Sequence, residues 1–162
     1  MYGFDKSEYD TATEEMINFF NGIPKESLFF RPNLEDAWSN QEHIIHFIDC
    51  EIAVFVRLKT ILADSGITMY ENIEDNWTKR IDYHKENVND YIAVMRVIRK
   101  MACHLFMNVI DEQYEGNYVM HVKYGKIDLP TWVKWYTSYH FRFHKNLIER
   151  NLTLWRKNDG KH

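Results

Sequence analysis

Apolar residues recur along this chain with the period of an α-helix, and the pattern predicts a bundle of helices. Each predicted helix has an apolar face too wide to leave exposed to water, so the helices are expected to pack against one another. The second is apolar on most of its faces, which is typical of a helix at the centre of a bundle. The fold class that follows is all-α, a four-helix bundle. The four segments are residues 7–21, 39–65, 86–112 and 129–157.

The connections between the predicted helices are long. About twenty residues follow Gly66, and about fifteen follow Gln113, before the next helix begins, whereas neighbouring antiparallel helices need roughly 2–8. A crossover topology is therefore as compatible with the sequence as a simple up-and-down bundle. The second connection has short aromatic and β-branched stretches beside Gly116 and Gly125, which are compatible with a small hairpin.

The helix predicted over 39–65 has a clear start and few polar positions. Ser39 is a good N-cap, and Glu42, three residues later, completes a capping box. Glu51 lies further along this mostly apolar helix, where a buried carboxylate needs a cationic or hydrogen-bonding partner. We predict that Arg99, on the third helix, is this partner.

Composition narrows the class of protein. A chain of 162 residues has the length of one domain with a substantial core, and we expect a single domain over residues 1–162. Aromatic residues make up 15% of the chain, yet no apolar run approaches the roughly 18 residues of a membrane span. The acidic first ten residues lack the regions of a secretory signal, so a cytoplasmic location is expected.

Charge and cysteine content disfavour two further classes. The net charge is −4 and the 20 Lys and Arg residues are scattered, so no basic stripe is available to bind nucleic acid. Cys50 and Cys103 lie within helical patterns, and two such thiols make no disulfide framework. We interpret both cysteines as small packing residues.

The most informative chemistry lies in the last predicted helix, which contains two histidines. His140 and His144 are four residues apart, so their side chains lie on one face, and that face also carries the apolar residues of the segment. Both rings are therefore expected to point inward. Two buried imidazoles are costly unless each ring nitrogen has a partner, and a divalent metal ion is a partner for two of these nitrogens.

A third ligand is expected on another helix, and His46 is the best candidate. It shares a face with Glu42 and Cys50 on the most thoroughly apolar helix. His43, one turn earlier, is about 60° away around the helix. His43 could lie next to the metal site without binding the metal, but we interpret it as a surface residue. The other histidines fall in loops, on a solvent face or at the terminus: His84, His104, His121 and His162.

The three histidines also have a simpler explanation as independent core residues bonded to backbone, Tyr or Asp groups. An inward i, i+4 pair with a third histidine on a separate buried helix favours a metal site. Two known classes of metal site do not fit, because no Glu-x-x-His occurs and Phe141 stands where the zincin motif needs glutamate. Without that glutamate, binding a thiol, which a coordinated cation deprotonates, fits better than base-assisted hydrolysis.

These residues resemble the DinB/YfiT-like superfamily of four-helix-bundle metalloenzymes. The resemblance rests on AWSNQEHIIHFIDCE at 37–51, on FRP at 30–32 and on KYGKIDLPTWVKWYTSYHFRFHKNLIE at 123–149. The superfamily pattern W-S-x-x-E-x-x-x-H, followed by a distal H-x-x-x-H, implies His46, His140 and His144 as the metal ligands. Phe143 and Leu147 replace a histidine and a glutamine that many members have, which reduces the polarity around the ligands.

The resemblance implies a cytoplasmic, often dimeric protein with a divalent metal, Zn²⁺ or else Ni²⁺. Its characterised members include transferases and isomerases that use a small thiol such as bacillithiol or mycothiol, and several are induced by damage or stress. The implied function is thiol S-transfer, in which the bound metal activates the thiolate for attack on an electrophile. Trp38 and Tyr136 could shape the pocket, although packing alone also accounts for each.

Two alternatives remain open. Metal-assisted hydrolysis needs a proton acceptor, for which Glu42 and Asp49 are the carboxylates on the right face. A non-enzymatic metal-binding protein of the stress response is the other alternative. A substrate-sized cleft that opens onto the histidines favours an enzyme, and a sealed site favours the non-enzymatic protein.

Overall fold

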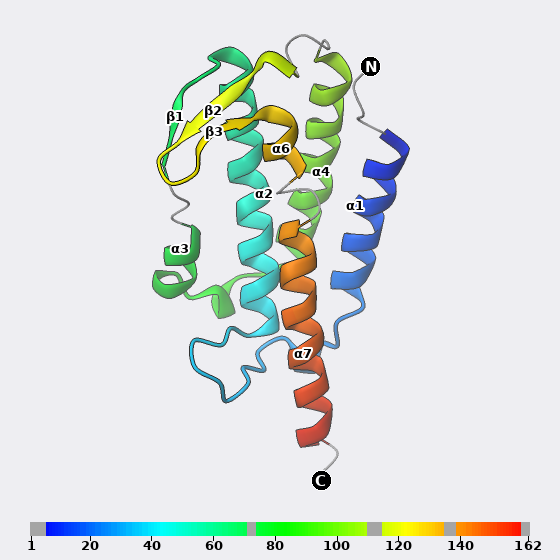
Figure 1. Cartoon of the computed structure of the whole chain (residues 1–162). Coiled ribbons are helices and arrows are strands. Elements are labelled where there is room, and N and C mark those ends of the chain that lie inside the picture. The colour runs from blue at the N-terminus through cyan, green and yellow to red at the C-terminus, as the bar shows by residue number, and fades with distance from the viewer. Residues whose placement is uncertain (1–5, 71–73, 110–114, 135–138, 160–162) are drawn as a thin grey trace.

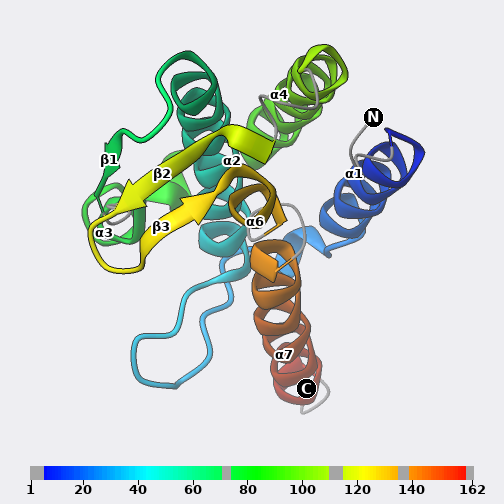
Figure 2. The same cartoon turned by 45° about the horizontal axis from the view of Figure 1, so that its top comes forward.

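The computed structural model describes residues 6–70, 74–109, 115–134 and 139–159. Four long helices lie side by side, with a small sheet at one end (Figures 1 and 2). They are α1 (Lys6–Asn21), α2 (Asn40–Ala63), α4 (Val88–Asn108) and α7 (Phe141–Asp159). The predicted four-helix bundle is confirmed. Shorter helices lie between these four: η1 (Lys25–Ser27), α3 (Glu74–Arg80), η2 (Tyr83–Lys85) and α6 (Leu129–Lys134).

Helix α2 begins at the predicted place because Ser39 caps it. The hydroxyl of Ser39 accepts a hydrogen bond from the backbone N–H of Glu42 at 3.2 Å, and the Glu42 carboxylate accepts one from the backbone N–H of Ser39 at 2.6 Å. This capping box satisfies N–H groups that a helix terminus otherwise leaves unpaired. Residues 40–48 are all buried, so a side chain in this part of α2 is enclosed whichever way it points.

The bundle has a crossover topology. Helices α1 and α7 run in one direction and α2 and α4 in the other, as the colour gradient of Figure 1 shows. Because α2 and α4 are extensive neighbours, the chain between them must return along the bundle before α4 begins. The 24 residues of α2 span about 36 Å. The long connection after Gly66 covers this distance.

A three-stranded sheet lies at one end of the bundle. β2 (Tyr118–His121) and β3 (Gly125–Asp128) form the antiparallel hairpin that the sequence indicated, and Gly125 supplies a φ of 72° at its turn. β1 (Thr68–Met69) pairs with β2 in parallel and was not predicted, since two residues are too few to show alternation. The sheet covers the end of the helical bundle, and the centre is formed by the helices.

The segment predicted as one helix over 129–157 is described as two helices, α6 and α7. Residues 135–138, between them, lie outside the described part of the chain. Helix α6 buries Leu129, Trp132 and Val133 beside β3, whereas α7 packs on α2 (Figure 2). Tyr139 and His140 have π-helical conformation immediately before α7. Such turns are frequent at functional sites.

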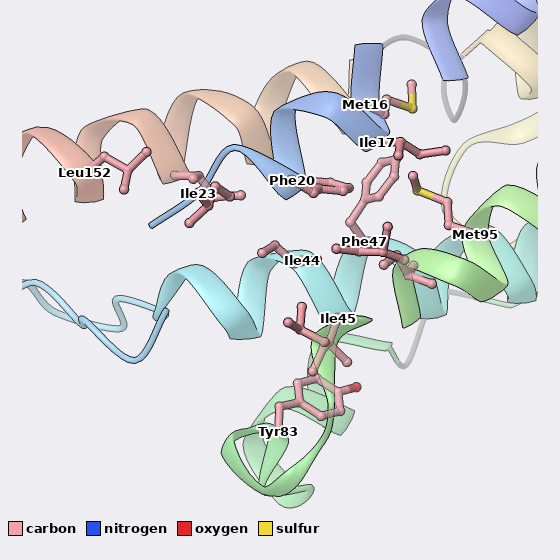
Figure 3. Packing of buried hydrophobic residues seen from close by; sticks show 14 residues of the cluster. Met16, Ile17, Phe20, Ile23, Ile44, Ile45, Phe47, Tyr83, Met95 and Leu152 are labelled. Carbon is pink, nitrogen blue, oxygen red and sulfur yellow. The ribbon is translucent and has the colours of Figure 1, made fainter. Parts of the chain in front are cut away.

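The buried apolar side chains form two clusters. The first joins the four long helices, and in it Phe20 of α1 packs edge-on against Phe47 of α2, with ring centroids 5.7 Å apart (Figure 3). The second lies under the sheet and contains Trp132 with Val119 and Ile127. Among the described residues, none of the helices combines the length and hydropathy needed to cross a membrane.

A buried ion pair crosses the bundle between α4 and α2. Nη1 of Arg99 donates to Oε2 of Glu51 at 2.9 Å, and both side chains are buried, so the predicted partnership is confirmed. Nε of Arg99 donates to the Thr13 hydroxyl at 2.8 Å, and the guanidinium lies 4.3 Å from the centroid of the Tyr9 ring. The ion pair and its neighbours therefore link α1, α2 and α4.

Candidate metal centre

The structure brings His46, His140 and His144 together. His46 comes from the buried first half of α2, His144 from the first turn of α7, and His140 from the π-helical residues just before it. One ligand atom from each ring lies within 4.8 Å of the other two. His46 and His144 are each 3% exposed, and His140 is half-buried. Three converging imidazole nitrogens at this spacing have the composition of a divalent-metal site.

Two of the rings, His140 and His144, are held in the neutral form that a metal requires. Burial, and after it the neighbouring His46, lowers the pKa of His140 to about 3. Burial also lowers the pKa of His144 well below its usual range, with His140 and His46 as further causes. Nε2 of His144 lies 3.0 Å from Nε2 of His140. Two nitrogens that face each other at this distance cannot both carry a proton, so at least one lone pair points between the rings.

A fourth histidine, His43, adjoins the cluster. Its Nδ1 lies 3.1 Å from Nδ1 of His144, and the residue is 3% exposed, so our interpretation of His43 as a surface residue is wrong. The reason is that α2 is enclosed around its whole circumference here, so a 60° offset from His46 does not reach solvent. Burial lowers the pKa of His43 to about 3, with Arg150 and then His46 as further causes. Nε2 of His43 has no hydrogen-bond partner among the described residues.

Aromatic rings surround the cluster. The Trp38 ring lies 5.3 Å from His43, 4.8 Å from His46 and 6.1 Å from His144, measured between centroids. Phe47 stacks on His140 at 5.3 Å. These contacts place Trp38 at the site, as the sequence allowed, whereas Tyr136 lies outside the described residues.

An open cavity of about 1010 Å³ lies over the three histidines. This volume is close to the upper end of the range for small-molecule sites, which is about 300–1000 Å³. His43, Trp38 and Cys50 also line it. So do Phe143 and Leu147, the two positions at which the sequence departs from the superfamily pattern. These departures therefore make one wall of the cavity more apolar.

The two carboxylates considered as proton acceptors are already engaged. Glu42 lines the cavity, but its carboxylate accepts the N–H of Ser39 and pairs with Arg31. Asp49 accepts a hydrogen bond from the Tyr83 hydroxyl and is not among the described residues that line the cavity. Sγ of Cys50 lies 3.5 Å from Nε2 of His46, a contact that an interpretation as simple packing did not anticipate.

The remaining histidines lie apart from the cluster wherever they are described. Nε2 of His84 lies 2.9 Å from the Ser39 hydroxyl, and His104 is exposed on α4. His121 ends β2, and its Nδ1 accepts a hydrogen bond from the backbone of Lys123. His162 lies outside the described residues.

The chain therefore forms a crossover four-helix bundle with a buried histidine cluster beneath an open cavity. No protein-family model and no curated protein matches the chain. Among solved structures, YfiT from Bacillus subtilis matches with a TM-score of 0.77 and 16% sequence identity, over 93% of this chain and 89% of YfiT. YfiT is described as a probable metal-dependent hydrolase with an unusual four-helix bundle topology. At this identity the likeness concerns the fold, and it confirms the DinB/YfiT-like fold that the sequence resemblance implied.

Proposed function

We propose that this protein is a metal-dependent enzyme in which His46, His140 and His144 hold a divalent cation. Zn²⁺ is the first candidate and Ni²⁺ the second, because imidazole suits both. The proposal is supported by the three ligand atoms within 4.8 Å of one another and by the burial that lowers the pKa of His140 and His144 and so keeps these two rings neutral. A divalent cation held by three imidazoles has free coordination positions and lowers the pKa of a thiol or a water molecule that binds there.

The open cavity is the observation that favours an enzyme over a non-enzymatic binding protein. A site that only stores or senses a metal needs no entrance larger than the ion. The cavity of about 1010 Å³ instead admits a small molecule to the face of the cluster lined by His46, His140 and His144. The apolar side chains of Trp38 and Phe143 would exclude water around a bound substrate.

We infer thiol S-transfer as the reaction, and the state of the carboxylates supports it. Glu42 is committed to the start of α2 and to Arg31, and Asp49 is committed to Tyr83. Neither carboxylate is placed as a general base for hydrolysis. S-transfer needs no such base, because coordination alone makes the thiol acidic. The thiol proton passes to the buffer, the sulfur forms a bond to the electrophilic carbon, and the leaving group departs with its electron pair.

The test is conjugation of a thiol to 1-chloro-2,4-dinitrobenzene by protein purified without an affinity resin and loaded with Zn²⁺ or Ni²⁺. We expect the rate of chloride displacement to follow metal occupancy. It should persist in the double variant Glu42→Gln, Asp49→Asn, because a glutamine in place of Glu42 can still complete the capping box. His46→Ala is the matched control and should lose both metal and rate.

Hydrolysis is the second candidate, and Glu42 at the cavity wall is the observation that favours it. In that case ester hydrolysis should need no added thiol and should fall by roughly 10²–10⁴ in Glu42→Gln. Metal-loaded protein that is inert toward thiols and esters alike would contradict both reactions. The homodimer and the cytoplasmic location stay predictions, which sedimentation and cell fractionation can test.

A further inference from the structure

Arg150 is a cation of the cavity wall for which the described residues supply no acidic partner. It lies on α7 two turns after His144, is half-buried and lines the same cavity as the histidine cluster. Arg31, Arg96 and Arg99 each pair with a glutamate, whereas none of the ion pairs in the described part of the chain involves Arg150.

The guanidinium of Arg150 is held in one orientation by a buried amide. Oδ1 of Asn151 accepts hydrogen bonds from Nε and Nη2 of Arg150, at 3.4 and 3.1 Å. Asn151 is fully buried, and its Nδ2 donates to the backbone carbonyl of Trp38 at 2.9 Å. Two N–H groups of the guanidinium are thus used inside the protein. The Nη1 hydrogens and the second Nη2 hydrogen have no acceptor among these contacts. One N–H of Nη1 and one of Nη2 point side by side, which is the geometry for two parallel hydrogen bonds to a carboxylate.

The charges around the cavity favour a ligand with a single negative charge. Loading the cluster adds two positive charges to neutral histidines, and Arg150 adds a third. Apart from Arg150, the cavity is lined by the cations Arg31, Lys79 and Arg80 and by the acids Glu35, Asp36, Glu42 and Asp82. The acids exceed these cations by one charge, and this excess repels a doubly charged phosphate more than a carboxylate. A carboxylate bound near Arg150 neutralises local charge and meets less of this repulsion.

We propose that Arg150 is a specificity-determining residue that binds a carboxylate of the substrate while another group of the same molecule reaches the histidine cluster. This inference rests on the proposed function, since it takes the cavity to be a substrate site. It assigns the substrate class as small carboxylic acids with a metal-binding group, of which a carboxylate-bearing thiol is the form that S-transfer would use.

The test compares matched acids and alcohols for binding to the full chain loaded with Co²⁺. Mercaptoacetate, 3-mercaptopropionate and 4-mercaptobutyrate are each paired with the corresponding mercaptoalcohol, and Kd is taken from the thiolate-to-cobalt absorption. We expect one of the acids to bind at least tenfold more tightly than its alcohol, because a charge-assisted hydrogen bond is added. Arg150→Gln should remove that preference while it changes the Kd of the alcohol much less, and Arg150→Lys should keep part of the preference.

Two controls distinguish this inference from other outcomes. Lys79, an exposed cation on α3, lines the same cavity, so Lys79→Gln removes one positive charge without touching Arg150. An equal loss of preference in Lys79→Gln, or equal Kd values for acid and alcohol in the unaltered protein, would overturn the assignment. Tighter binding of the phosphonate analogue would overturn the choice of carboxylate.

A second probe pair separates this inference from the thiol proposal. Imidazole-4-acetate and 4-methylimidazole bind a metal without a thiol. One result would support the carboxylate site and contradict the thiol function. In that result thiols do not bind, but imidazole-4-acetate binds more tightly than 4-methylimidazole and Arg150→Gln removes the difference. If the mercapto acids and imidazole-4-acetate all bind more weakly than their neutral partners, the proposed carboxylate site is wrong. Thiol binding can then still be measured with the mercaptoalcohols.

Discussion

The ring nitrogens of single histidines determine what this site can bind. Nε2 of His144 faces His140, and its Nδ1 faces Nδ1 of His43 at 3.1 Å. For Nε2 to bind a metal, the proton of the His144 ring must be on Nδ1, which then donates to His43. With a metal on Nε2 of His144, His43 would fix the tautomer and the orientation of that ring without contributing a ligand atom, as the partners of metal ligands commonly do.

This arrangement predicts a graded effect at His43. His43→Leu removes the acceptor and should weaken Zn²⁺ binding by roughly 10–100-fold, measured by competition with a chelator. His43→Asn places an amide oxygen near the position of Nδ1 and should restore most of the affinity, which a role in packing alone would not explain. Alanine at any of the three proposed ligands should cost far more. Metal loss in His43→Ala with retention in His46→Ala would show that the ligand set is wrong.

Part of this candidate site could be predicted from the sequence for identifiable reasons. The i, i+4 spacing of His140 and His144 and the apolar surroundings of His46 are local properties, and the helical period translates them into direction. The burial of His43 depends on how much of the circumference of α2 is covered by other elements. The orientation of Arg150 depends on Asn151 and on a backbone carbonyl of the distant Trp38. Neither the burial of His43 nor the orientation of Arg150 can therefore be predicted from the spacing of residues in the sequence.

Helices and strands differ in how strongly their sequences specify them. The start of α2 was predictable because Ser39 and Glu42 form a local capping box. β1 was not, because its two residues are held by pairing to β2, which is distant in the sequence. The division of 129–157 into α6 and α7 accompanies the packing of α6 beside β3, another tertiary contact that the helical period does not contain.

The ion pair between α2 and α4 gives a test of how these elements are held together. Arg99→Met leaves Glu51 buried without a cation, so the free energy of unfolding should fall by about 3–5 kcal/mol. Adding Glu51→Leu to this variant removes the buried carboxylate that has lost its partner. The double variant should therefore recover much of the lost free energy of unfolding. Urea unfolding of the two single variants and the double variant measures the coupling. Purely additive effects would contradict a direct interaction between these buried groups.

The whole molecule assembles the site from segments about one hundred residues apart. The histidines of α2 and those around the start of α7 meet because the chain crosses over and brings α7 back against α2. The long connections allowed this topology, but their lengths did not distinguish it from an up-and-down bundle. Loop length limits which helices can be neighbours, and the packing of apolar faces across the bundle then decides the arrangement.

The buried histidines should make the stability of the whole metal-free protein depend on pH. Burial lowers the pKa of His43 and His140 from 6.5 to about 3, and lowers that of His144 as well. Below about pH 6.5 the unfolded chain gains protons that the folded protein does not, so stability falls as pH falls. Between about pH 7.5 and 5.5 we expect a loss of about 1 kcal/mol for each of these histidines, measured by urea unfolding in chelator.

Carboxylates contribute little in this window, because their usual pKa values lie near about 4. His140→Gln should therefore flatten the pH dependence, whereas His104→Gln, at an exposed position, should leave it unchanged. Saturating Zn²⁺ should raise stability by about 2.7 kcal/mol at a hundredfold excess over Kd, and by a similar amount at about pH 7.5 and about pH 5.5, because His140 and His144 stay unprotonated in the folded protein at both values. A metal-free protein equally stable at both pH values would contradict the burial of neutral rings, and stabilisation by Zn²⁺ that disappears at about pH 5.5 would contradict it as well.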